Sequence, residues 1–384
     1  MINKPEIIFT FPACMGGVAS FNFNIINNCS LINSFHSKVI LLKEEEDKRP
    51  LFLENFAVNE VIIFDYSNKE NQYYVRKRLN NLLGVTKGAI VTDNSLTITT
   101  AKLFNNPKTI YHLIHDFLYV NQNVNLTDLV DVAIAHSSFF SDAVFASNPS
   151  LFSGRSFYIP YGVKCISTLP PKKSRLMNLV FLGRLDAGKG VLKLIEIEKK
   201  LQIKNIEVNW TIIGKGPLKN ELLNQWASKT NVCFKEPDST EEVYSLLALQ
   251  DVLILPTSFE GTPVSILECL ANGVVTITND LPGGIRDIIT ENTGFKCSIN
   301  KISEFVEKIE MLNNNDKVLR QLQINCHTLS VNKYNIQNNA LNYFKLFLEY
   351  EKFNRPTKSG NFQVSFLDKA IFPNILVKFL RRLI

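Results

Sequence analysis

The sequence predicts an α/β protein with two domains, each built around a parallel sheet. The chain has 384 residues. A domain usually holds about 100 to 200 residues, so a chain of this length is expected to form two domains, each with its own hydrophobic core. Short apolar runs alternate with longer polar or periodic stretches, and this alternation is typical of βα units whose strands pair in parallel. Three of the runs end in glycine-containing loops, at the position where open α/β sheets bind ligands.

The first half begins with a strand that ends near two adjacent glycines. Gly16 and Gly17 follow this first apolar run. Because glycine has no side chain, the pair can bring the backbone against a phosphate or an acceptor, or it can form only a tight turn. We expect strands at four short apolar runs in this half, residues 7–11, 39–42, 61–64 and 110–113.

A linker separates the two halves. Residues 167–175 are rich in proline and basic residues and show no hydrophobic period, which indicates an interdomain linker. We therefore assign residues 1–170 to an N-terminal domain and residues 171–345 to a C-terminal domain. We assign residues 346–384 to a C-terminal helical tail.

The second half opens with an apolar strand at 179–182 and a loop that carries Gly183, Arg184 and Lys189. Arginine offers a planar fork and lysine a point charge, so the pair can neutralise a leaving diphosphate without a metal ion. The alternative is an ordinary basic surface loop. The spacing also matches a phosphate-binding loop, but Gly190 stands where that motif needs Ser or Thr to bind magnesium. We therefore do not expect an ATPase or GTPase.

The most informative run follows the apolar strand at 251–255, where Glu260 and Glu268 flank a glycine turn and the start of a helix. A helix start presents unpaired backbone N–H groups and a partial positive charge, which suit an anion. Carboxylates accept hydrogen bonds from paired hydroxyls, so the run predicts a site for a nucleotide or a phosphorylated sugar. The alternative is two exposed glutamates on a surface helix. The residues expected at the anion site are Gly261, Thr262, Pro263 and Val264.

A third strand, at 210–213, ends at Gly214. Glycine here permits close approach of the backbone to a ligand. Because the carboxyl ends of parallel strands meet at one edge of a sheet, we expect the loops after residues 182, 213 and 255 to lie together.

These motifs resemble those of the retaining glycosyltransferases of the GT4 family, also called glycosyltransferase group 1. The resemblance rests on Gly-Arg-Leu-x3-Lys-Gly at 183–190, Ile-Gly-Lys-Gly-Pro at 213–217 and Glu-x7-Glu at 260–268. The first half matches more loosely, and residues 159–163 depart from the family's usual Asn-Gly-Val-Asp pattern. The resemblance implies the GT-B fold, in which two Rossmann-like domains face each other with their parallel sheets across a cleft.

The resemblance also implies a reaction and its partners. The protein would be a retaining hexosyltransferase that moves a sugar from a UDP- or GDP-linked donor to a hydroxyl of a glycan or lipid-linked acceptor. The product would belong to a bacterial surface polysaccharide of the cell envelope. The nucleotide sugar is then a co-substrate and no other cofactor is implied. The chain has no Asp-x-Asp signature, so we expect no requirement for a metal ion.

The residue roles follow from the same resemblance. Arg184 and Lys189 would bind the diphosphate, and Glu268 would accept hydrogen bonds from the ribose hydroxyls. Glu260 would contact the donor sugar near the reacting centre without necessarily forming a covalent bond. His115 precedes Asp116 after an apolar strand, where a matching histidine of the family faces the donor sugar. We expect His112 and His136 to be structural.

Other functions stay open. An epimerase of sugar nucleotides or a phosphorylase can share this architecture, because fold does not determine function. A non-catalytic subunit that keeps the fold and only binds a partner enzyme is a further alternative. A dinucleotide-dependent oxidoreductase is disfavoured, because the first strand is followed by Gly16 and Gly17 rather than by Gly-x-Gly-x-x-Gly.

Composition limits the partners and the compartment. A net charge of +6 is too mild to indicate nucleic acid. Seven cysteines without close pairs indicate reduced thiols and no metal site. The start has no signal-peptide shape and no apolar run reaches about 18 residues, so we expect a cytoplasmic protein.

The C-terminal residues 366–384 mix large apolar and basic side chains. Two arrangements fit this composition. The segment either packs as a helix on the first domain or lies on an anionic membrane, with Lys378, Arg381 and Arg382 near phosphates. The second arrangement would make the protein peripheral on the inner face of the plasma membrane, where a lipid-linked acceptor is found.

Overall fold

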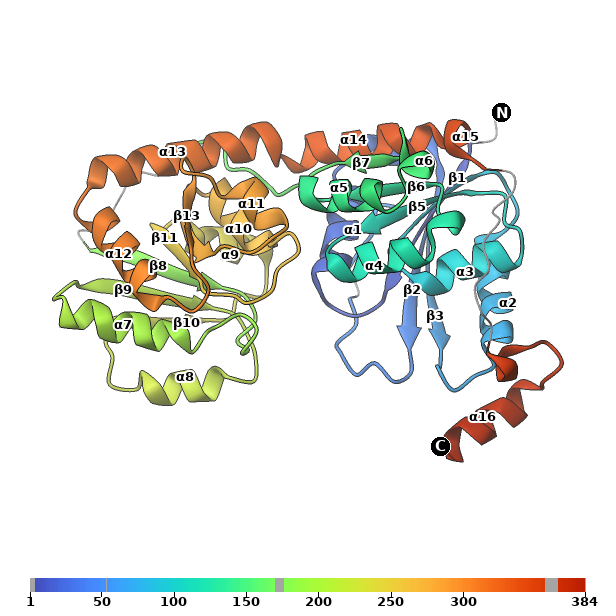
Figure 1. Cartoon of the computed structure of the whole chain (residues 1–384), viewed down its shortest axis with the longest axis horizontal. Helices are drawn as coiled ribbons and strands as arrows, with labels where there is room; N and C mark the ends of the chain where they lie inside the picture. The colour runs from blue at the N-terminus through green and yellow to red at the C-terminus, as the bar shows by residue number, and fades with distance from the viewer. Residues whose placement is uncertain (1–3, 53, 170–175, 356–364, 384) are drawn as a thin grey trace. The chain divides into compact units, whose positions relative to one another are not determined.

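The computed structural model describes residues 4–52, 54–169, 176–355 and 365–383 (Figure 1). The chain divides into two compact units. Unit 1 comprises Met1–Pro160 and Gln337–Ile384, and unit 2 comprises Tyr161–Ile336. Each unit holds one parallel sheet. The predicted architecture of two parallel-sheet α/β domains is therefore confirmed.

Unit 1 contains a seven-stranded sheet in the order β3-β2-β1-β4-β5-β6-β7. All its neighbouring strands pair in parallel. Every residue of β5 is buried, because helices cover both faces of a sheet of this kind. The strands are β1 (Glu6–Pro12), β2 (His36–Glu44), β3 (Glu60–Tyr66), β4 (Gly88–Thr92), β5 (Thr109–Ile114), β6 (Val132–Ala135) and β7 (Ser156–Tyr158). The four strands expected in this half are confirmed.

The helices of unit 1 come from both ends of the chain. Those of the first part are α1 (Gly17–Asn27), η1 (Ser30–Ser34), α2 (Gln72–Leu83), α3 (Ser95–Leu103), α4 (Phe117–Asn125), η2 (Thr127–Leu129), α5 (Ser138–Ser147) and α6 (Pro149–Phe152). The last part adds α14 (Ile336–Leu348), α15 (Tyr350–Phe353), η3 (Phe366–Asp368) and α16 (Asn374–Leu383). The rings of Phe344 and Phe347 in α14 each lie 6.0 Å from that of Phe9 in β1, so α14 belongs to the core of unit 1.

Unit 2 repeats the same winding with a six-stranded sheet in the order β10-β9-β8-β11-β12-β13. Its strands are β8 (Met177–Leu182), β9 (Val208–Ile213), β10 (Val232–Lys235), β11 (Val252–Leu255), β12 (Val275–Asn279) and β13 (Gly294–Cys297). Its helices are α7 (Lys193–Ile203), α8 (Lys219–Gln225), α9 (Thr240–Leu247), α10 (Val264–Ala271), α11 (Gly284–Ile288), α12 (Ile302–Asn313) and α13 (Asp316–Lys333). Both sheets thus have the strand order of the Rossmann fold, which reverses beside the first strand.

The division into units differs from the boundaries expected at residues 170 and 345. Val163 pairs with Asn335, and its N–H donates to the Tyr334 carbonyl at 2.8 Å. These contacts place the segment after residue 160 with unit 2. The packing of α14 on β1 places residues 337–345 with unit 1. The expected linker residues 170–175 lie outside the described residues. Among the residues that the structure does describe, no helix is both long enough and apolar enough to span a bilayer.

Candidate functional site

The loops that follow β8, β9 and β11 meet at the carboxyl edge of the unit 2 sheet. β8 is the strand from which the sheet winds in both directions, toward β9 on one side and β11 on the other. A reversal of strand order leaves a crevice outside the strand ends, and α/β proteins bind ligands there. The three predicted glycine-containing loops therefore lie at the switch point of this sheet.

Backbone contacts fix the β8 loop against the β9 loop. Gly214 has a φ of +145°, and a Cβ added there would lie 1.9 Å from the Gly183 carbonyl oxygen. The Leu185 N–H also donates to the Lys215 carbonyl at 2.9 Å. The close approach expected at Gly214 is thus made to a neighbouring loop of the protein. Its expected contact with a ligand stays a prediction.

The β8 loop is also locked to the β11 loop. Gly190 has a φ of +70°, and a Cβ there would lie 2.1 Å from the Pro256 carbonyl oxygen. The Ser258 N–H donates to the Gly188 carbonyl at 2.9 Å. This contact gives a physical reason for glycine at position 190, because a serine or threonine side chain would have no room.

Lys189 and Glu260 form an ion pair across these two loops. The Lys189 ammonium Nζ lies 2.6 Å from Oε1 of Glu260. The Glu260 side chain is only 7% exposed, whereas that of Lys189 is 28% exposed. A carboxylate that is this deeply buried needs an oppositely charged partner. Because an ammonium has three N–H donors, Lys189 can stay hydrogen-bonded to Glu260 and still donate to another anion. The structure therefore brings together two of the predicted site residues.

Asp186 orients both predicted cations, and our sequence analysis did not identify it. Its carboxylate pairs with the Arg184 guanidinium and accepts the Lys189 N–H at 3.0 Å. Partial burial acts to raise the pKa of Asp186, but these hydrogen bonds and charges outweigh it, and the pKa is lowered. Arg184 itself is 74% exposed. An acidic residue two positions after the arginine was the sequence signal for this arrangement.

The start of α10 presents backbone donors without a side-chain cap. Pro263 precedes the helix, and no side chain caps its first turn. The Thr262 hydroxyl is buried, and it has no hydrogen-bond partner among the described residues. The Gly284 N–H donates to the Gly261 carbonyl at 2.9 Å, which holds this turn in place. The predicted anion site at residues 261–264 therefore has unpaired polar groups, and Gly284 is a support that the sequence analysis missed.

Glu268 lies further along α10 and is partly exposed. Burial raises the pKa of its carboxyl to about 7. Among the described residues, no cation forms an ion pair with it. Burial also raises the pKa of the nearby Tyr244 hydroxyl in α9, and the negative charge of Glu268 adds to this effect. A carboxylate with few compensating donors is suited to accept hydroxyl donors from a ligand.

Unit 1 holds the remaining predicted residues, at the carboxyl edge of its own sheet. Gly16 directly precedes α1 and Gly17 is the first residue of that helix. A Cβ added to either glycine would meet nothing within 4 Å. Gly16 has an extended backbone with a φ of 165°, which any residue can adopt. Neither glycine is therefore required by a tight turn or by contact with described residues.

His115 follows β5 in a largely buried aromatic setting. Its Nε2 lies 3.5 Å from the Asp93 carboxylate, which follows β4. Its ring centroid lies 5.0 Å from that of Tyr119 and 4.6 Å from that of His136. Asp93 was missed in the sequence analysis, although its place directly after β4 was a usable signal. The placement of His115 relative to the unit 2 loops stays a prediction.

The two other histidines of this region make structural hydrogen bonds. His112 Nδ1 lies 2.9 Å from Asn123 Oδ1, and His136 Nδ1 lies 2.7 Å from the Tyr343 hydroxyl. Burial lowers the pKa of His112 and lowers that of His136 well below its ordinary value. Both imidazoles are therefore neutral near pH 7.

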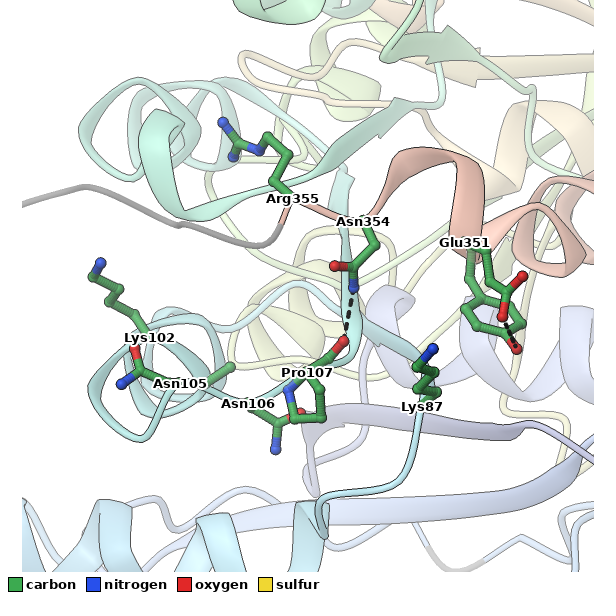
Figure 2. Close-up of a pocket in the computed structure, with 10 residues that line it drawn as sticks. Lys87, Lys102, Asn105, Asn106, Pro107, Glu351, Asn354 and Arg355 are labelled. Atoms are coloured by element: carbon green, nitrogen blue, oxygen red, sulfur yellow. Dashed lines mark hydrogen bonds between the residues drawn. The ribbon is translucent and has the colours of Figure 1, made fainter.

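A separate cavity of about 610 Å³ lies at the opposite edge of the unit 1 sheet. Figure 2 shows its lining residues, among which Lys87 precedes β4 and Pro107 precedes β5. The Asn354 amide donates to the Pro107 carbonyl at 2.7 Å. None of the predicted site residues lines this cavity. It lies at the amino ends of the strands, where α/β sheets do not usually bind their substrates.

Comparison with known proteins adds a sequence match for the second half. Residues 170–327 match the family model described as glycosyl transferases group 1. The UDP-Gal:alpha-D-GlcNAc-diphosphoundecaprenol alpha-1,3-galactosyltransferase of Escherichia coli is 28% identical over 159 residues, which cover 40% of this chain and 41% of that protein. The chain spans less than half the length of the curated relatives that it matches.

Solved structures match nearly the whole chain. The apo form of the lipopolysaccharide outer core galactosyltransferase WaaB has a TM-score of 0.69 at 16% identity, covering 90% of this chain and 99% of that one. Anabaena Alr3699/HepE in complex with UDP-glucose also has a TM-score of 0.69, at 13% identity. That match covers 90% of this chain and 99% of the Anabaena chain. At such identities the likeness shows the fold alone, which is that of the GT-B glycosyltransferases. The family match shows that the sequence of unit 2 is similar to that of group 1 glycosyltransferases.

Proposed function

We propose that this protein transfers a hexose from a UDP- or GDP-linked donor to an acceptor hydroxyl, with retention of anomeric configuration. The observation that carries the proposal is the Lys189–Glu260 pair, which lies at the sheet's switch point. The uncapped start of α10 follows Glu260 in the same loop. The group 1 family match covers all of these residues.

The chemistry requires stabilisation of the leaving diphosphate. In the reaction, the bond from the anomeric carbon to the diphosphate oxygen breaks, and a bond to the acceptor oxygen forms on the same face. The acceptor's proton leaves with the nucleoside diphosphate. Charge builds on the diphosphate as the sugar becomes oxocarbenium-like. Lys189, Arg184 and the first N–H groups of α10 supply preorganised positive charge for it.

Glu260 serves the sugar rather than the diphosphate in this proposal. Its carboxylate is held by Lys189 at 2.6 Å, so it is positioned to accept hydrogen bonds from the donor sugar's hydroxyls. No covalent intermediate on Glu260 is required. His115 in unit 1 contacts the donor sugar from the first domain, and Gly16 and Gly17 leave room for the phosphates or the acceptor.

The nucleotide is recognised through its ribose. The Glu268 carboxylate accepts from the two ribose hydroxyls and becomes ionised as it does so. A metal ion is not needed in this scheme, because the two cations and the helix start offset the charge of the diphosphate. UDP is the first nucleotide to test, since the E. coli relative is named for UDP-Gal and a structural neighbour was solved with UDP-glucose.

The acceptor is a glycan or a lipid-linked glycan of the bacterial cell envelope. Support comes from the printed names of two similar proteins, which act on a diphosphoundecaprenol-linked GlcNAc and on the lipopolysaccharide outer core. Synthesis of such a product would place the enzyme in the cytoplasm, at the inner face of the plasma membrane.

A thermal-shift screen with UDP, GDP, ADP and their common sugar conjugates tests the proposal. We expect one nucleotide to stabilise the protein without added metal, and Glu268→Ala to abolish that shift. Donor turnover with an undecaprenyl-diphosphate-linked sugar then tests transfer, and the anomeric configuration of the product tests retention. Phosphate-dependent turnover, an isomerised donor, or no shift at all from folded protein would reject the proposal.

A further inference from the structure

The C-terminal helix α16 is attached to unit 1 through its polar side. The Arg381 guanidinium donates to both carboxylate oxygens of Asp368 at 3.0 Å and to the Glu70 carbonyl. The Asn374 side-chain oxygen accepts the Asn71 N–H at 2.8 Å. Among the apolar residues of this helix, Val377 is fully buried. These contacts fix which face of α16 is turned outward.

The segment before α16 is held in the same way at the start of α2. The Asn71 amide donates to the Lys369 and Phe372 carbonyls at 3.0 and 2.8 Å. The Gln72 N–H donates to the Asp368 carboxylate at 2.7 Å. A helix start attracts a carboxylate, so Asp368 stabilises α2 while also holding Arg381. The segment from Phe366 to α16 is therefore a docked element of unit 1.

The apolar side of this element is exposed. Ile375 is 86% exposed, Phe379 59% and Leu376 46%, all on α16. Phe366 and Ile371, just before the helix, are 65% and 75% exposed. An amphipathic helix in a globular protein normally turns its apolar stripe toward the core. Here the side that carries Asn374, Val377 and Arg381 faces the protein, so the exposed apolar side chains are available to a partner.

The charge around the apolar surface selects the class of partner. Of the four cations in residues 365–384, Lys378 and Arg381 pair with carboxylates of unit 1, and two remain for a partner. Arg382 and Lys369 are exposed beside the apolar side chains. An anionic lipid surface supplies phosphates for the cations and an apolar interior for the side chains. A second copy of the chain fits less well, because a two-fold contact through this surface would bring its own cations together.

The element also lies at the edge of unit 1 that the acceptor would use. It binds the loop after β3, and His115 follows β5 in the same parallel sheet. In Figure 1, α16 lies at the end of the unit toward which the arrows of β2 and β3 point. A bilayer bound there would face the carboxyl edge of the sheet. This last step rests on the proposed function, whereas binding to the bilayer does not.

We propose that the segment from Phe366 to the end of α16 docks the protein on an anionic bilayer. In this arrangement Ile375 and Phe379 enter the interfacial region. Arg382 and Lys369 contact lipid phosphates. Arg381 and Asp368 hold the helix with its apolar side outward.

Flotation with phosphatidylglycerol-containing and pure phosphatidylcholine vesicles tests this proposal. We expect the full chain to float with the anionic vesicles. Ile375→Asp/Phe379→Asp should lower the partition coefficient about tenfold or more, because it replaces two inserted apolar groups with charges. The matched control is Val85→Asp. Val85 is 78% exposed in the same unit but lies between α2 and β4, so this variant should float like the parent.

Three results would overturn the proposal. The double variant could float as well as the parent, or the parent could float equally with neutral vesicles. Alternatively, the parent could be a dimer that does not float and that the double variant converts to a monomer, which would assign the surface to a second copy. Thermal melting confirms that each variant is folded, as expected for substitutions at exposed positions. A nucleotide-induced thermal shift, measured on the same variants, reports the donor site separately.

Discussion

The ammonium of Lys189 lies 2.6 Å from the carboxylate of Glu260, although the two residues are 71 positions apart. The Glu260 side chain is nearly buried, and Lys189 forms an ion pair with it. The pair therefore has a structural role in the folded chain in addition to the role proposed for it in catalysis. Separating these roles requires variants of both residues.

We expect Lys189→Ala to lower the transfer rate about 100-fold or more, because it removes a donor that stabilises the leaving group. It should also lower the free energy of unfolding by roughly 1–3 kcal/mol, because the Glu260 carboxylate is left without its partner. Lys189→Ala/Glu260→Gln should recover most of the stability and none of the activity. Urea unfolding and donor turnover measure the two effects. Unchanged turnover in Lys189→Ala would remove this residue from the diphosphate site.

Glu268 should make the stability of the unliganded protein depend on pH. Its folded pKa of about 7 lies above the ordinary value of 4.5, so the folded chain retains a proton that the unfolded chain releases. Stability is therefore lost as the pH rises from about 4.5 to 7. Glu268→Gln should remove this loss and be more stable than the parent by roughly 1–3 kcal/mol above pH 7. Glu291→Gln, at an exposed position of the same unit, should behave like the parent.

Nucleotide binding should show the opposite pH dependence at the same residue. If the ribose hydroxyls donate to an ionised Glu268, the affinity for the nucleotide rises with pH until the carboxyl is ionised. Binding then releases a proton, which calorimetry in buffers of different ionisation enthalpy detects. We expect Glu268→Gln to bind more weakly and to lose the proton release. Retention of the proton release in this variant would assign it to another group.

Gly190→Ala should disturb the site through the backbone. The added methyl group would lie 2.1 Å from the Pro256 carbonyl, at a φ of +70°. We expect a loss of roughly 1–3 kcal/mol in stability and weaker nucleotide binding, because the β8 and β11 loops must separate. The matched control is Gly154→Ala in unit 1, where φ is +67° and an added Cβ would meet nothing within 4 Å. Equal effects of the two substitutions would show that the locking of the loops is unimportant.

Gly16→Ala should leave the stability of unit 1 unchanged and slow the transfer reaction. The added methyl group meets no atom within 4 Å and the backbone is extended, so the melting temperature should be almost unchanged. If phosphates or the acceptor approach this backbone closely, the rate of transfer should fall at least about tenfold. Parent activity in Gly16→Ala would leave Gly16 without a role in the reaction.

Several features were predictable because they depend on local pattern. Short apolar runs such as residues 39–42 indicate buried strands, since a strand covered on both faces is rich in apolar side chains. Pro263 before the apolar helix indicates uncapped N–H groups, since the proline side chain has no hydrogen-bond acceptor. These signals lie within a few residues of each other and need no knowledge of the rest of the fold. They were sufficient for the fold class and for most of the candidate donor residues.

Other features depend on which distant segments pack together. The order β9-β8-β11 brings Lys189 beside Glu260 and Gly190 against Pro256. The supporting role of Gly284, whose N–H donates to the Gly261 carbonyl, follows from a loop contact that no local period encodes. The orientation of α16 is decided in the same way. Its sequence shows an amphipathic helix, but the hydrogen bonds that Asn374 accepts from Asn71 and that Arg381 donates to Asp368 determine which side faces solvent. Local composition sets which side chains a segment offers, and only long-range packing decides what each of them meets.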